Sequence, residues 1–145
     1  MRNLCLVMTV VMYGGLAVPA AQEKPAPKPS NMGGSVTGGM VTPLEQTSKS
    51  SIAYFRFDPG ARTKWHTHEV GQVVVCEEGP CLTQVKGGPV IEMKAGDSVY
   101  SGAGVMHWHG ASPDKGCVQF NVSRGASTFL DDVTDTDYKG PRKKL

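Results

Sequence analysis

The property of this chain that most limits its fold is the short length of its apolar runs. From residue 50 onward, apolar or alternating segments have the length of strands, and each is bounded by Gly, Pro, Asp or Asn. They cover residues 52–57, 65–68, 72–76, 82–86, 90–93, 98–100 and 118–122. Before residue 125, no stretch keeps apolar positions at helical spacing long enough for a helix. The pattern therefore predicts an all-β fold, either a sandwich or a barrel.

The N-terminus predicts export. Residues 1–20 contain a basic residue near the start, an apolar run at 4–18 and small residues before Ala21, which is the order found in a secretory signal peptide. The apolar run is shorter than the ~20 residues that span a bilayer and is interrupted by Gly14 and Gly15, so an uncleaved anchor is the weaker alternative. Cleavage after Ala20 predicts a periplasmic or secreted protein that has no membrane contact.

The remaining chain predicts a single domain, because about 120 residues is an ordinary domain size. Residues 21–40 are rich in Pro and Gly and predict a flexible linker. We expect the folded domain at 41–140 and a basic tail at 141–145, with a short helix or turn within 127–138. The net charge is only +2, and the basic residues form no patterned face, so nucleic-acid binding is not predicted.

Three cysteines would remain after signal cleavage, namely Cys76, Cys81 and Cys117. Cys76 and Cys81 flank residues 77–80, which have the composition of a hairpin loop. These two cysteines could form a cross-strand disulfide in an oxidising compartment, or could be small buried hydrophobic residues. The odd count leaves at least one thiol unpaired.

All four histidines fall in two tight pairs, His66 with His68 and His107 with His109. In a strand, residues two apart point to the same face, so the imidazoles of each pair share one side of the sheet. Two imidazoles on one face can bind the same metal ion. Gln72 begins the next strand, where its carbonyl oxygen could reach the same point.

The spacing around these histidines resembles the two motifs of the cupin superfamily. The first motif is matched by Gly60, His66, His68, Gln72 and Gly79, and the second by Gly96, Gly104 and His107. Three positions depart from the usual pattern: Gln72 replaces a glutamate, Gly102 a proline and Ala111 an asparagine. The resemblance implies a single-domain double-stranded β-helix, also called a jelly-roll barrel.

The resemblance also implies one divalent metal ion, bound by His66, His68, Gln72 and His107. Manganese is the preferred ion, and Fe, Ni, Co and Zn are alternatives. Three neutral imidazoles and a neutral amide leave the full charge of the ion in place, whereas a glutamate would cancel part of it. We therefore expect a stronger Lewis acid than in a site with glutamate.

The segments at 57–68, 71–72 and 107–111 are similar to small bacterial cupins of the carboxymuconolactone decarboxylase-associated group, which includes manganese-dependent hydroxynitrile lyases. This similarity implies a metal-dependent lyase acting on a small organic molecule. His109 shares the inward face of His107 and is the candidate catalytic base; the alternative is that it only supports a ligand. Lyases of this kind are expected to have a histidine on the late strand near position 119, where this chain instead has Gln119. A cupin dioxygenase and a non-catalytic small-molecule-binding cupin are the other two hypotheses.

The remaining candidates are interpreted as structural. Lys64 is expected at the rim, and Phe55, Phe57 and Phe120 are expected to fill the barrel rather than contact a substrate. Trp65 and Trp108 point away from the histidines, so they should pack in a second layer or at a dimer interface. We expect a homodimer, because an open strand edge promotes association.

Overall fold

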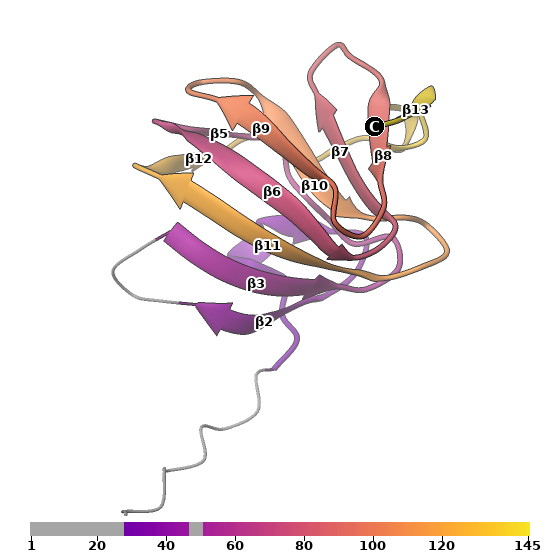
Figure 1. Cartoon of the computed structure of the whole chain (residues 1–145), viewed down its shortest axis with the longest axis horizontal. Coiled ribbons are helices and arrows are strands. Elements are labelled where there is room, and N and C mark those ends of the chain that lie inside the picture. The colour runs from indigo at the N-terminus through magenta and orange to yellow at the C-terminus, as the bar shows by residue number, and fades with distance from the viewer. Residues whose placement is uncertain (1–27, 47–50) are drawn as a thin grey trace, which may run out of the picture.

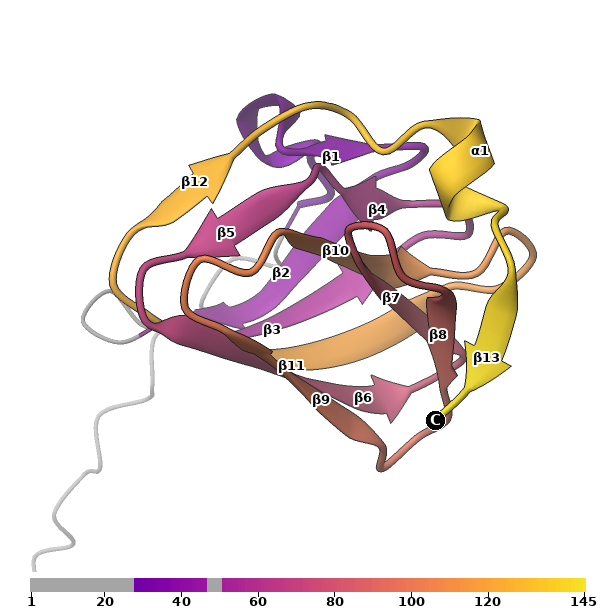
Figure 2. The ribbon, with the colours of Figure 1, turned by 90° about the horizontal axis from the view of Figure 1, so that it is seen from above.

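The computed structural model describes residues 28–46 and 51–145. Two β-sheets face each other and form a jelly-roll sandwich (Figures 1 and 2), which confirms the predicted fold class. The predicted signal peptide lies outside the described residues. In the part of the chain that is described, no helix is long and apolar enough to cross a membrane.

The five-stranded sheet has the order β2-β3-β11-β6-β9. Its strands are β2 (Val41–Gln46), β3 (Ser51–Phe57), β6 (Gly71–Glu78), β9 (Ser98–Gly102) and β11 (Cys117–Arg124). The eight-stranded sheet follows the order β1-β4-β10-β7-β8-β13, with β5 joined to β10 and β12 joined to β5. Its strands are β1 (Val36–Thr37), β4 (Arg62–Thr63), β5 (His66–His68), β7 (Cys81–Val85), β8 (Val90–Met93), β10 (His107–Ala111), β12 (Ser127–Phe129) and β13 (Arg142–Lys144). The short helices are η1 (Met32–Gly34) and α1 (Asp135–Tyr138).

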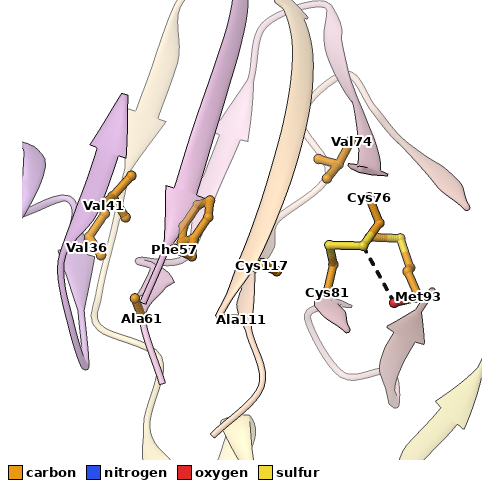
Figure 3. Packing of buried hydrophobic residues seen from close by; sticks show 10 residues of the cluster. All are labelled: Val36, Val41, Phe57, Ala61, Val74, Cys76, Cys81, Met93, Ala111 and Cys117. Carbon is orange, nitrogen blue, oxygen red and sulfur yellow. Dashed lines mark hydrogen bonds between the residues drawn. A yellow bond between two sulfur atoms is a disulfide. The ribbon is translucent and has the colours of Figure 1, made fainter. Parts of the chain in front are cut away.

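The first hydrophobic cluster lies between the two sheets (Figure 3). It contains Val36, Val41, Phe57, Ala61, Val74, Cys76, Cys81, Met93, Ala111 and Cys117, and Phe55 packs against it. Cys76 and Cys81 form a disulfide, so the structure selects the bridge from the two alternatives that the sequence left open. Cys117 is free and buried.

The second cluster contains Trp65, Leu82, Val90, Trp108, Val133 and Tyr138. It covers the opposite face of β10 from His107 and His109, because side chains alternate along a strand. The Tyr138 hydroxyl donates to the Ala111 carbonyl at 2.8 Å, and the Arg62 guanidinium lies 4.2 Å from the centre of the Tyr138 ring. The C-terminal segment therefore closes a second layer, which is one of the two arrangements predicted for the tryptophans.

The ends of the domain differ from the sequence prediction. β1 lies within the predicted linker 21–40, yet it pairs with β4 and Val36 is only 5% exposed. β13 lies within the predicted tail and pairs in parallel with β8. The short helix expected within 127–138 is present as α1, and it is preceded by β12, which was not expected. These segments are added to sheet edges by backbone hydrogen bonds, which need no apolar side-chain pattern.

We predict that Leu82→Ala lowers the free energy of unfolding by about 2–5 kcal/mol, because it leaves a cavity in the second cluster. Leu82 is fully buried. Val85→Ala on the same strand is the control, since Val85 is 48% exposed and should change stability by less than about 0.5 kcal/mol. Urea unfolding of both variants measures the difference, and equal effects would contradict the role given to this cluster.

Candidate metal centre

Strands β5 and β10 bring the two histidine pairs together. His66 and His107 are direct cross-strand partners in the antiparallel β5–β10 pair, and His68 shares the face of His66 because it lies two residues further along β5. His66, His68 and His107 are all buried, and each offers a ring nitrogen that lies within 4.8 Å of the others. The pair His66 and His68 and the distant His107 thus form one cluster, as predicted.

The Nδ1 atoms of two of these rings are held by backbone carbonyls. His66 Nδ1 lies 2.9 Å from the Lys64 carbonyl oxygen, and His107 Nδ1 lies 2.9 Å from the Val105 carbonyl oxygen. A carbonyl can only accept, so both rings carry their proton on Nδ1 and leave the Nε2 lone pair free. This is the tautomer that a histidine needs in order to bind a metal through Nε2.

His68 is held in a different way. Its Nδ1 lies 2.9 Å from the Ser127 hydroxyl on β12, and β12 pairs with β5 (Figure 2). Its Nε2 is buried and has no hydrogen-bond partner among the described residues. An unsatisfied buried nitrogen is costly unless it has a ligand, and a metal ion would satisfy it.

Gln72 reaches the cluster from the five-stranded sheet. Its Oε1 lies 2.9 Å from His107 Nε2, which places two acceptor atoms next to each other. Ligands at roughly 2.1 Å from one ion and at right angles to each other lie about 3 Å apart. Gly71, just before Gln72, permits the close pairing of β6 with β9: its φ is +108°, and a Cβ there would lie 2.8 Å from the Ser101 carbonyl oxygen.

Burial keeps the three imidazoles neutral. Burial, together with the charge of a protonated His107, lowers the pKa of His66 from 6.5 to about 3. Burial also lowers the pKa of His68 and of His107. Neutral nitrogen donors with one amide oxygen suit a divalent first-row metal ion, so the donor set fits an ion of this class.

His109 lies beside the cluster, and its ring centre is 5.2 Å from that of His66. Its Nδ1 is 2.7 Å from Gln119 Oε1, while Gln119 Nε2 donates to the Gly110 carbonyl at 3.0 Å. That carbonyl fixes the Gln119 amide with its oxygen toward His109, so the ring is protonated at Nδ1 and bare at Nε2. Burial, with the nearby imidazoles, holds the pKa of His109 well below its usual value.

Two residues around the cluster were not predicted from the sequence. Ser127 holds His68, and the Phe129 ring packs at a tilt against His66 with ring centres 5.3 Å apart. Both lie on β12, opposite β5 in register. An alternating pattern at 127–129 would have indicated a strand, but three residues are too few to distinguish it from a turn.

The other candidates are not part of the three-histidine cluster. Lys64 forms an ion pair with Asp132 at 3.2 Å, and Phe120 packs on Tyr54 with ring centres 4.7 Å apart. Phe57 belongs to the core and packs edge-on against His109, with ring centres 5.8 Å apart. Lys64 is therefore bound to a surface carboxylate, and the phenylalanines serve packing.

This chain has a jelly-roll fold in which three buried histidines converge on one point. This combination is typical of metal-binding β-barrel proteins. The family model described as Cupin domain matches residues 53–122. The (R)-mandelonitrile lyase of Granulicella tundricola is 36% identical over 106 residues, a match that covers 68% of this chain and 81% of the relative. The chain belongs to the cupin superfamily.

Solved structures agree with this assignment. A cupin-like protein from Thermotoga maritima has a TM-score of 0.65 and 32% identity, covering 72% of this chain and 85% of that protein. A cupin 2 conserved barrel domain protein from Rhodopseudomonas palustris has a TM-score of 0.54 at 17% identity, covering 77% of this chain and 78% of that protein. The second similarity shows the fold alone.

We predict that His66→Ala abolishes stoichiometric metal binding, because it removes one of three converging imidazoles. The loss of the ion should also lower the melting temperature, since a ligand that binds only the folded state stabilises it. Elemental analysis and thermal unfolding of the purified variant test both effects. His109→Ala is the control and should keep its metal; full metal content in His66→Ala would refute the ligand assignment.

The lowered histidine pKa values predict acid sensitivity of the metal-free protein. Because the pKa of His66 falls from 6.5 to about 3 on folding, the unfolded chain binds a proton more readily than the folded one. Stability should therefore decrease as the pH falls through 6.5 toward about 3. Urea unfolding across this range measures the slope, and His66→Gln, which cannot be protonated, should flatten it. An identical slope in both proteins would contradict the prediction.

Proposed function

We propose that this cupin is a metal-dependent lyase that cleaves 2-hydroxynitriles into a carbonyl compound and hydrogen cyanide. The single observation that carries the proposal is the position of His109, a neutral imidazole with a bare Nε2 beside the three-histidine cluster. The relative named (R)-mandelonitrile lyase, 36% identical to this chain, supports the substrate class.

His66, His68, Gln72 and His107 would hold the metal ion, for which we propose manganese. When bound, the ion supplies a Lewis acid that stabilises negative charge on an oxygen atom. The four side chains contribute no negative charge of their own, so none of the charge of the ion is neutralised by its ligands. Their burial excludes water and strengthens this electrostatic effect.

His109 would act as the base. Gln119 holds its Nδ1 proton, so Nε2 is the atom that can accept the proton of a substrate hydroxyl. As the hydroxyl oxygen forms the carbonyl, the carbon–carbon bond breaks and its electron pair leaves with the cyanide carbon. The proton on Nε2 then passes to cyanide, which yields hydrogen cyanide and returns His109 to its neutral form.

Because position 119 is a glutamine, the site would contain a single base, His109. Gln119 is fully buried, and both ends of the amide are engaged, by His109 on one side and by Gly110 on the other. A histidine expected near this position would add a second titratable group, whereas glutamine only orients the first. In this chain, the proton transfer would therefore depend on His109 alone.

We predict that His109→Ala lowers turnover of mandelonitrile by about 100- to 10,000-fold, the usual cost of losing a general base. Metal content should stay at the wild-type level, because His109 is not one of the three converging ligands. Elemental analysis and benzaldehyde release are measured on the same preparation. His66→Ala is the comparison and should lose metal and turnover together. Full metal with undiminished turnover in His109→Ala would exclude the base role.

Oxygen uptake in the same assay separates this proposal from a dioxygenase, which consumes oxygen. A protein that only binds a small molecule would release no benzaldehyde.

Export to the periplasm or medium and assembly as a homodimer, both expected from the sequence, stay predictions.

A further inference from the structure

The inference concerns Asn121, a buried side chain on β11 that the site described above does not use. Its exposed fraction is 3%, and its Oδ1 has no hydrogen-bond partner among the described residues. Buried amides are almost always paired, because an unpaired one loses its hydration without replacement. A buried amide kept free in this way suggests a ligand that completes it.

The register of the sheet places Asn121 on the same face as the metal cluster. Along β11, side chains alternate, so Asn121 shares the face of Gln119, which contacts His109. On β6, the partner of Gln72 is Ser123, and the partner of Val74 is Asn121. Asn121 is thus the diagonal neighbour of Gln72 across the β6–β11 pair, and such positions lie roughly 7–8 Å apart.

The two amides of β11 have different environments. Gln119 is held at both ends and cannot turn. Asn121 lies between Val74 on β6 and Ala53 on β3, and neither side chain can donate or accept a hydrogen bond. The unpaired atom, Oδ1, is an acceptor, and a half-turn of the amide exchanges it with the NH2 group. In that orientation the NH2 group occupies the unpaired position and can donate to an acceptor on a bound molecule.

We infer that Asn121 is a substrate-binding residue that donates a hydrogen bond to the nitrile nitrogen of a 2-hydroxynitrile. The inference rests on the proposed function, in which the hydroxyl of the substrate is used by the metal cluster and His109. The nitrile is then the second polar group of the substrate, and it is an acceptor. Donation from the amide would also stabilise the negative charge that develops on cyanide as the carbon–carbon bond breaks.

Binding of two analogues tests the inference without requiring turnover. Phenylacetonitrile carries the nitrile but no hydroxyl, and 1-phenylethanol carries a hydroxyl but no nitrile. We expect Asn121→Leu in the metal-loaded protein to weaken phenylacetonitrile binding by about 3- to 10-fold, the usual effect of one neutral hydrogen bond. Binding of 1-phenylethanol should be unchanged. Ligand-observed NMR titration measures both affinities, and Val122→Ala, on the opposite face of β11, is the matched control.

Thermal unfolding distinguishes a binding role from a purely structural one, because loss of a structural residue would lower the melting temperature. Removing an unpaired buried amide should leave the melting temperature of Asn121→Leu equal to or above that of the wild type. Unchanged phenylacetonitrile binding in Asn121→Leu would overturn the inference whatever the melting temperature, as would a wild type that does not bind phenylacetonitrile. In a further outcome, Asn121→Leu loses nitrile binding selectively, but the wild-type protein releases no benzaldehyde from mandelonitrile. That result would refute the lyase proposal while supporting the binding role of Asn121.

Discussion

The anchoring of imidazole Nδ1 atoms is the interaction on which the functional architecture of this protein depends. A buried imidazole has two ring nitrogens, and unless one is held, the ring can present either its proton or its lone pair to the site. Here the carbonyls of Lys64 and Val105 hold His66 and His107. Each carbonyl belongs to the residue two positions before its histidine, so the same short segment supplies both the ligand and its orientation.

This local anchoring relies on long-range structure for its effect. The ligands of β5 and β10 meet because the two strands pair at His66 and His107, and Gln72 arrives from the opposite sheet. Trp65 and Trp108 fix the reverse faces of these strands within the second cluster. The histidines therefore converge only when the two sheets are ordered, and a bound ion would in turn stabilise the ordered sheets.

The strand pattern and the shared face within each histidine pair could be predicted from the sequence, because both depend on the alternation of side chains along a strand. That His107 and Gln72 join His66 and His68 was implied by the spacing of the cupin motifs. The roles of Ser127 and Gln119 could not be predicted. Ser127 is 59 positions from His68, and only the pairing of β12 with β5 brings them together. The strands β1 and β13 were also missed, since edge strands are joined by backbone hydrogen bonds and their side chains need not be apolar.

The two amides of β11 show why satisfied and unsatisfied polar groups carry different information. Gln119 and Asn121 have the same chemistry, lie two residues apart and are equally inaccessible to solvent, so sequence pattern and burial cannot distinguish them. The difference lies in their partners: Gln119 is engaged at both ends, whereas Asn121 Oδ1 is unpaired among the described residues. A satisfied amide contributes to the rigidity of the site, and an unsatisfied one reduces stability until a ligand binds. The strand thus holds one amide that orients the His109 ring and one whose oxygen has no partner among the described residues, and it is the second that we propose contacts a substrate.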